Sequence, residues 1–176
     1  DLEAALEKVA RVRLGVTPQR RSARVTSVFS TKGGLGATTM AINLAVCLAE
    51  RHRGKTLLVE LDTRPSDVAT FLDLKPSYSV LDALGNLSRL DESFLHGVLM
   101  RHESGLAVLP GPIKMERGDL HGEQGPAGLG ILRSHFDHIG LDLRPDPGPG
   151  AVAGLEASGG LLYPPGPHVA GVPAGA

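Results

Sequence analysis

A glycine-rich stretch that joins a short apolar run to a helix-forming run constrains the fold of this chain more than any other feature. The stretch reads Ser30-Thr31-Lys32-Gly33-Gly34-Leu35-Gly36-Ala37-Thr38-Thr39. It follows the apolar run 25–29 and leads into the run 40–50. Glycines let backbone N–H groups approach an anion, and a helix N-terminus adds unpaired donors and the positive end of a dipole. The stretch therefore predicts a strand, a phosphate-binding loop and a helix, in that order.

Two positions of the stretch depart from the general phosphate-loop pattern G-x-x-x-x-G-K-[ST]. Gly36 and Thr38 match the pattern, whereas Thr31 replaces the first glycine and Ala37 replaces the lysine. Another lysine, Lys32, stands early in the stretch, before two glycines. The order K-G-G-x-G-[K]-T-T resembles the deviant Walker A loop of the MinD/ParA ATPase superfamily. The version with alanine at the second lysine position is similar to the CpaE/TadZ branch, which is associated with Flp (Tad) pilus assembly.

Apolar strand-like runs alternate with helical patterns along most of the chain. We expect strands at 25–29, 56–61, 107–109, 139–143 and 161–163, and helices within 36–50, 79–84, 91–101, 129–135 and 151–158. This alternation predicts an α/β fold with a doubly wound, mostly parallel sheet. The resemblance, which extends over about residues 22–160, implies the P-loop NTPase fold of the MinD/ParA superfamily without its C-terminal part.

Two of the expected helices have an apolar face that predicts which residues are buried. In the helix after the glycine-rich stretch, this face consists of Ala41, Leu44, Ala45 and Leu48, and we expect Cys47 in the core as a small hydrophobe. In the segment 91–101, Asp91 is the expected N-cap, and the apolar face consists of Phe94, Leu95, Val98 and Leu99.

Three parts are expected along the chain. Residues 1–24 form an amphipathic helix and a linker; the resemblance assigns that helix to an upstream receiver-like domain, and a helix packed on its own domain is the alternative. Residues 25–163 form an incomplete nucleotide-binding domain. Residues 164–176, rich in glycine and proline, form a tail that we expect to be disordered. Since the chain begins at Asp1 inside a helical pattern, we expect it to be part of a longer protein.

The charge balance and the histidine spacing argue against two classes of site. The 18 basic and 19 acidic residues nearly cancel, so the composition gives no reason to expect a nucleic-acid partner. Only the cluster Arg20, Arg21 and Arg24 favours DNA or acidic lipid, and a solvated linker explains it as well. The seven histidines have no compact metal-binding spacing, and we expect His135 and His138, which are three residues apart, to be surface histidines.

The chain contains no signal peptide and no run of about 20 apolar residues that could cross a membrane. Its single cysteine, Cys47, excludes an internal disulfide and fits a reducing compartment. We therefore expect a cytoplasmic protein, and the resemblance adds a peripheral position at the inner membrane or the cell pole.

The resemblance also implies an ATP and Mg²⁺ site and assigns its roles to particular residues. The cofactor-binding residues are Lys32, Gly33, Gly34, Leu35, Gly36, Ala37, Thr38 and Thr39. The Thr38 hydroxyl would ligate Mg²⁺, and Asp142, in the Walker B-like segment 136–143, would hold the ion through water. Asp62, at the end of the motif Leu57-Leu58-Val59-Glu60-Leu61-Asp62, would orient the attacking water. Lys32 would reach the phosphates of a second subunit, which implies a homodimer joined through the phosphate-loop face.

Ala37 predicts that ATP is bound but turned over slowly or not at all. A lysine there would neutralise charge on the β- and γ-phosphates, and losing one such contact typically costs about 10²–10³ in rate. The first hypothesis is a dimerising localisation factor that binds ATP and contacts pilus-assembly proteins. The alternatives are an active ParA/MinD-type ATPase that partitions DNA or positions a division site, and a scaffold whose glycine-rich turn binds no nucleotide.

Overall fold

The protein is described here by a computed structural model, which covers residues 23–61, 65–85, 87, 92–114, 124–143 and 149–164. The expected N-terminal helix, most of the linker that follows it, and the tail after Pro164 lie outside these residues. The same holds for Asp62 and for the expected N-cap Asp91.

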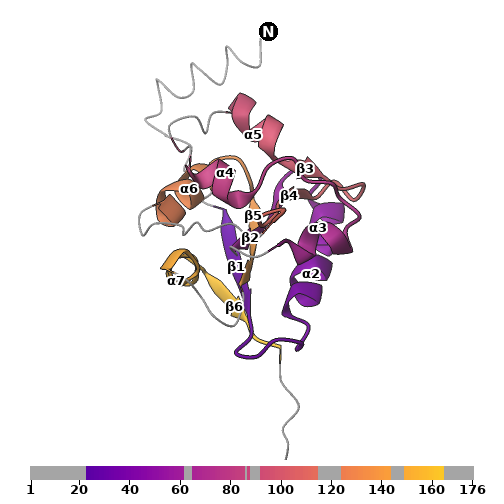
Figure 1. The fold of residues 1–176 in the computed structure, drawn as a ribbon, viewed down its shortest axis with the longest axis vertical. Coiled ribbons are helices and arrows are strands. Elements are labelled where there is room, and N and C mark those ends of the chain that lie inside the picture. The colour runs from indigo at the N-terminus through magenta and orange to yellow at the C-terminus, as the bar shows by residue number, and fades with distance from the viewer. Residues whose placement is uncertain are drawn as a thin grey trace, which may run out of the picture.

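A six-stranded sheet in the order β3-β4-β2-β5-β1-β6 runs through the centre of the molecule (Figure 1). Its strands are β1 (Arg24–Phe29), β2 (Thr56–Leu61), β3 (Met100–Arg101), β4 (Ala107–Leu109), β5 (His138–Leu143) and β6 (Gly160–Leu162). Neighbouring strands are parallel except β3, which is antiparallel to β4. The predicted α/β fold with a mostly parallel sheet is confirmed.

Helices cover both faces of the sheet, with α2 and α3 on one side and α4, α6 and α7 on the other (Figure 1). They are α2 (Ala37–Arg51), α3 (Asp67–Phe71), α4 (Val80–Gly85), α5 (Glu92–Val98), α6 (Gln124–Leu132) and α7 (Pro149–Glu156). Side chains alternate along β2: Leu57 and Val59 pack with α4 and α6, whereas Leu58 packs with α2. Both faces of this strand are buried, as its continuous apolar run predicts.

The helix predicted over 91–101 extends further at its C-terminal end than the helix in the structure. α5 ends at Val98, and the next residues form β3, where Met100 and Arg101 pair with Val108 and Ala107. The apolar periodicity of residues 91–101 cannot predict this pairing, because the pairing depends on β4, further along the chain. The expected apolar face is nevertheless correct: Leu95, Val98 and Leu99 are buried, and Phe94 is partly buried.

α6 begins at Gln124 and ends at Leu132, five residues before the start and three residues before the end of the helix expected over 129–135. Glycines obscure the helical pattern here, because they have low helix propensity. Tertiary packing requires one of them: a Cβ atom at Gly128 would collide with the side chain of Leu84 in α4. The close approach of α4 and α6 therefore explains why residue 128 is a glycine.

The prediction that Cys47 lies in the core is wrong, since its side chain is exposed. α2 buries Ala41, Ile42, Ala45 and Ala49, while Leu44 and Leu48 are only half-buried. Residues 41, 45 and 49 repeat every four positions along one face, and a residue two positions after Ala45 points about 200° away from it. Small alanines at the contact thus let α2 lie close to the sheet and turn the cysteine outward.

Candidate functional site

The glycine-rich loop joins the end of β1 to the first turn of α2, as its sequence predicts. Ser30 is buried, and its Oγ donates a hydrogen bond to the Lys32 carbonyl oxygen at 3.0 Å. Gly34 and Gly36 have φ angles of +80° and +79°, in the left-handed region that favours glycine. These two glycines let the chain turn sharply from the strand into the helix.

No side chain caps the N-terminus of α2. Gly36 is its N-cap and has no side chain that could accept hydrogen bonds from the first-turn amides; its carbonyl oxygen accepts the first helical hydrogen bond from Met40 N–H at 2.8 Å. The amides of Ala37 and Thr38 thus lie in the turn where helices leave donors unpaired and where their dipole is positive. The local chemistry fits a phosphate group.

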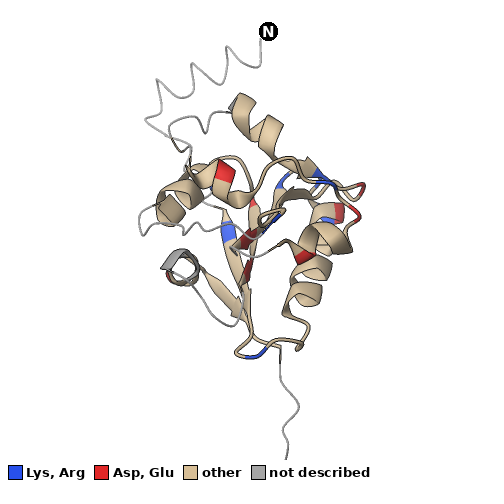
Figure 2. Cartoon of the chain, in the orientation of Figure 1, with Lys and Arg blue, Asp and Glu red and all other residues tan. Residues whose placement is uncertain are grey.

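Most of the loop is open to solvent. Residues 31–34 and Gly36 are exposed, and this exposed part contains the basic residue Lys32. Figure 2 shows a blue segment, the colour of Lys and Arg, in the loop between β1 and α2. Ala37 and Thr38 are half-buried in the first turn of α2, and Thr39 is exposed. A ligand could therefore reach the loop directly, and Lys32 lies where it could reach outward from the protein.

Asp142 is buried on the side of the sheet that carries α2. In the parallel register it pairs with Val28 of β1 and with Glu60 of β2, and paired residues on adjacent parallel strands point to the same face. Val28 packs against α2, so Asp142 and Glu60 face the same side as the helix that the loop begins. Asp142 is only 1% exposed and is the fifth residue of the six-residue strand β5.

Glu60 is a buried acid to which the sequence assigned no role. It is 1% exposed, and its carboxylate accepts hydrogen bonds from the Ser66 hydroxyl, from Asp67 N–H at 3.1 Å and from Gly111 N–H at 2.9 Å. A buried carboxylate is costly unless such donors surround it. The sequence feature that could have pointed to Glu60 is a glutamate inside an otherwise apolar strand.

A hydroxyl pair connects the loop to the adjacent edge of the sheet, where β6 pairs with β1. The Thr31 Oγ1 lies 2.7 Å from the Tyr163 hydroxyl, which follows the edge strand β6. Thr31 occupies the position of the first glycine in the general phosphate-loop pattern. Its side chain thus forms a contact that a glycine could not make.

The structure brings some of the predicted site residues to one end of the sheet. Lys32, Thr38 and Asp142 all lie beside the junction of β1, the loop and α2 on the same face. Asp62 comes directly after β2, outside the described residues. Within the described residues, no group of three or more histidine, cysteine and acidic side chains could hold a metal ion.

Two histidines lie close together at the opposite end of the strands. The His52 and His138 ring centroids are 4.6 Å apart. The pKa of His138 is lowered from its usual value of 6.5, mainly because the ring is partly buried. The nearby His52 and Arg24 lower it further. His138 starts β5, whereas Asp142 lies near its other end, so this pair is separate from the loop.

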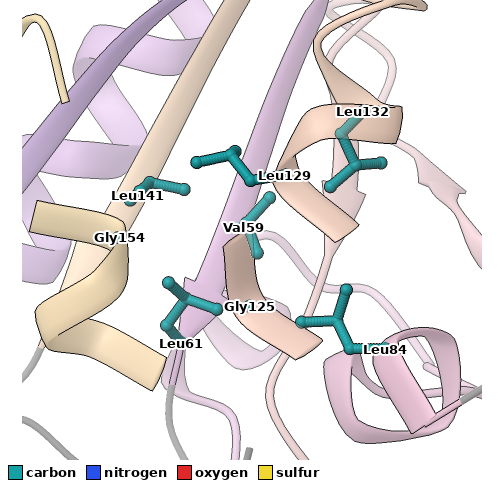
Figure 3. Close-up of a pocket in the computed structure, with 8 residues that line it drawn as sticks. All are labelled: Val59, Leu61, Leu84, Gly125, Leu129, Leu132, Leu141 and Gly154. Atoms are coloured by element: carbon teal, nitrogen blue, oxygen red, sulfur yellow. The ribbon is translucent and has the colours of Figure 1, made fainter. Parts of the chain in front are cut away.

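An apolar pocket lies on the other face of the sheet, between the strands and the helices α4, α6 and α7 (Figure 3). It contains about 300 Å³ of empty space, its opening included. Its lining consists of Val59, Leu61, Leu84, Gly125, Leu129, Leu132, Leu141 and Gly154. With no charged side chain in this lining, the pocket has little to offer a phosphate.

None of the described helices is long and apolar enough to span a lipid bilayer.

Comparisons with known proteins agree with this geometry. The family model described as AAA domain matches residues 23–167. The septum site-determining protein MinD of Synechocystis sp. is 27% identical over 136 residues, which are 76% of this chain and 47% of that protein. The chain spans about half the length of the curated relatives it matches.

Solved structures share the fold. A ParA family ATPase from Chlorobium tepidum superposes with a TM-score of 0.71 at 25% identity, over 80% of this chain and 59% of that one. The cobyrinic acid a,c-diamide synthase of Mycobacterium smegmatis, solved with an ATP analogue and magnesium, gives a TM-score of 0.66 at 27% identity, over 81% and 60% of the two chains.

Proposed function

Because this chain belongs to the AAA domain family, within the MinD/ParA superfamily of P-loop ATPases, we propose that it binds ATP with Mg²⁺ at the loop between β1 and α2. We further propose that it acts as a dimerising localisation and assembly factor of the CpaE/TadZ type for a Flp (Tad) pilus, with weak or no hydrolysis. It would work in the cytoplasm, peripherally at the inner membrane or the cell pole.

The observation that carries nucleotide binding is the loop itself. The two left-handed glycines and the uncapped first turn of α2 present backbone donors at one end of the sheet, and Asp142 is buried beside them on the same face. Backbone amides would surround the phosphates, the Thr38 hydroxyl would ligate Mg²⁺, and Asp142 would hold the ion through water. A related synthase was solved with an ATP analogue and magnesium, which supports the same ligand here.

Weak hydrolysis is inferred from Ala37. Its methyl group cannot neutralise the β- and γ-phosphates, whose charge is stabilised electrostatically during phosphoryl transfer. Asp62 would still orient a water, and Lys32 would reach the phosphates of a second subunit from the exposed part of the loop. The output of such a protein would be a nucleotide-dependent dimer that partners recognise.

The pilus assignment depends on the alanine at the second lysine position of the loop, which is similar to the CpaE/TadZ branch. An active ParA/MinD-type ATPase is the second candidate, and the similarity to MinD and ParA proteins favours it. A scaffold that binds no nucleotide is the third. Nucleotide binding and turnover, measured separately, distinguish the three.

The deciding experiment is calorimetric titration of Mg-ATP into the protein at its natural length, with phosphate release followed in parallel. We expect saturable binding with little phosphate release. Thr38→Val removes the hydroxyl that would ligate Mg²⁺ with little change in volume, and we expect it to weaken Mg-ATP binding about tenfold or more.

The matched control is Cys47→Ser, because this residue is exposed on α2 away from the loop and should leave binding unchanged. Rapid turnover by the wild-type protein would favour the active ATPase. A wild-type protein that binds no Mg-ATP would leave only the scaffold.

A further inference from the structure

Glu60 is a buried acid for which the proposed nucleotide site has not yet required a role. It occupies the fifth position of β2, is 1% exposed and points to the face that carries α2. A carboxylate in such a place is retained only where fixed donors hold it.

The donors come from two segments that are far apart in sequence. Ser66 and Asp67 form the N-terminus of α3, whereas Gly111 lies in the loop after β4. Oε2 of Glu60 accepts from the Ser66 hydroxyl and from Gly111 N–H, and Oε1 accepts from Asp67 N–H. One carboxylate thus connects the end of β2 to the start of α3 and to the loop after β4.

The two segments are also joined to each other. Ser66 N–H donates to the Pro112 carbonyl oxygen at 2.9 Å, and the Ser66 Oγ accepts from Ala69 N–H at 3.0 Å as the N-cap of α3. The Ser66 hydroxyl therefore caps the helix and donates to Glu60 at the same time. Moving Glu60 would disturb the cap and the loop together.

This unit lies beside the proposed Mg²⁺ site. Glu60 and Asp142 are register partners on adjacent strands and point to the same face. Along the chain, Asp62 falls between Leu61, the last residue of β2, and Ser66. The hydrogen bonds of Glu60 therefore anchor the described residues on both sides of the segment that contains the proposed water-orienting acid.

We propose that Glu60 is a positioning residue that holds the N-terminus of α3 and the loop after β4 against the end of β2, and so couples both segments to Mg-nucleotide binding. The coupling rests on the proposed function, whereas the hydrogen bonds themselves do not. Glu60 acts through Ser66, Asp67 and Gly111, beside its register partner Asp142.

Glu60→Gln tests the charge and the second acceptor atom. The amide has one oxygen in place of two, so its NH₂ group must face the Gly111 N–H or the Asp67 N–H, where two donors repel. Glu60→Asp keeps both acceptors but is one methylene shorter, and we expect an intermediate effect. Glu156→Gln is the matched control, because it makes the same change at an exposed glutamate of α7, on the opposite face of the sheet.

The first measurement is hydrogen exchange of single amides in the nucleotide-free protein of natural length, under conditions in which all variants are folded. We expect Glu60→Gln to accelerate exchange of Asp67 N–H and Gly111 N–H together, by about tenfold or more. The control should leave both rates unchanged. If both amides of Glu60→Gln exchanged at the wild-type rates, the proposal that Glu60 holds the two segments would be overturned.

The second measurement is the Mg²⁺ dependence of nucleotide affinity in the same variants. We expect Glu60→Gln to weaken Mg-ATP binding about tenfold and to leave binding of ADP without Mg²⁺ unchanged, because the loop amides remain in place. Equal loss for both nucleotides, or no loss, would overturn the coupling. If the wild-type protein bound neither nucleotide, the proposed function would fail with the coupling, and amide exchange would still decide whether Glu60 holds the two segments.

Discussion

Ala37 occupies the position of the lysine in the general phosphate-loop pattern, and the proposed weak hydrolysis depends on it. It is half-buried in the first turn of α2, where a longer cationic side chain would extend over the β- and γ-phosphates. We predict that Ala37→Lys raises the rate of phosphate release about 10²–10³-fold at saturating Mg-ATP. Single-turnover assays with labelled ATP measure this directly.

The control for this substitution is Ala37→Met, which adds length without charge. An equal rise in both variants would contradict an electrostatic origin. A rise confined to the lysine variant would mean that the other catalytic groups are already in place.

His138 makes stability depend on pH. Its folded-state pKa is lowered from 6.5 by partial burial and by the nearby His52 and Arg24, so the unfolded chain binds more protons in this range. The free energy of unfolding should therefore be highest above pH 6.5 and should fall as the pH drops below 6.5 towards the lowered pKa. Urea unfolding at pH 7.5 and at pH 5.5 measures the difference.

In His138→Gln this difference should be smaller than in the wild-type protein. His96→Gln, which replaces an exposed histidine on α5, serves as the control and should keep the wild-type difference. An unchanged pH dependence in His138→Gln would contradict the role of this side chain.

Among the secondary-structure elements, the contact between α4 and α6 depends on the absence of a side chain at Gly128. A Cβ atom at Gly128 would collide with the buried side chain of Leu84 and come within 3.3 Å of Leu87. We predict that Gly128→Ala lowers the free energy of unfolding by about 1–3 kcal/mol, because the core must shift to accept it. Denaturant unfolding curves measure the change.

Gly130→Ala, on the same helix, is the matched control. A Cβ atom there meets nothing within 4 Å, so the variant should gain up to about 1 kcal/mol of helix stability. If both variants stabilised the protein alike, the proposed clash at Gly128 would be absent.

For the whole molecule, the exposed loop is the surface through which two copies would meet. Lys32 and its glycine neighbours are exposed at one end of the sheet, and the proposed function requires this lysine to reach a second subunit. We predict that Mg-ATP shifts the wild-type protein from monomer to dimer in sedimentation velocity and that Lys32→Ala remains monomeric.

Lys75→Ala controls for the loss of one exposed positive charge and should dimerise like the wild-type protein. Dimerisation of Lys32→Ala to the same extent would remove Lys32 from the interface. Calorimetric titration of Mg-ATP into Lys32→Ala then separates a lost dimer contact, with binding retained, from a lost nucleotide site.

The sequence alone determined the fold class and the position of the loop, because both depend on local patterns. Gly34 and Gly36 permit the turn from strand to helix, and the alternation of apolar and helical segments requires a parallel sheet with helices on both faces. The resemblance of the loop and of the Walker B-like segment also predicted site roles for Lys32, Thr38 and Asp142. The roles of these residues and of Asp62 remain predictions.

Only the tertiary structure decided which side chains meet. The register of β5 with β2 places Glu60 beside Asp142, and the loop after β4 reaches Glu60 across 51 positions of sequence. The pairing of β3 with β4 ended α5 early, and the face of α2 that packs on the sheet leaves Cys47 exposed. These features depend on register and packing between distant segments, which the periodicity of a single segment does not contain.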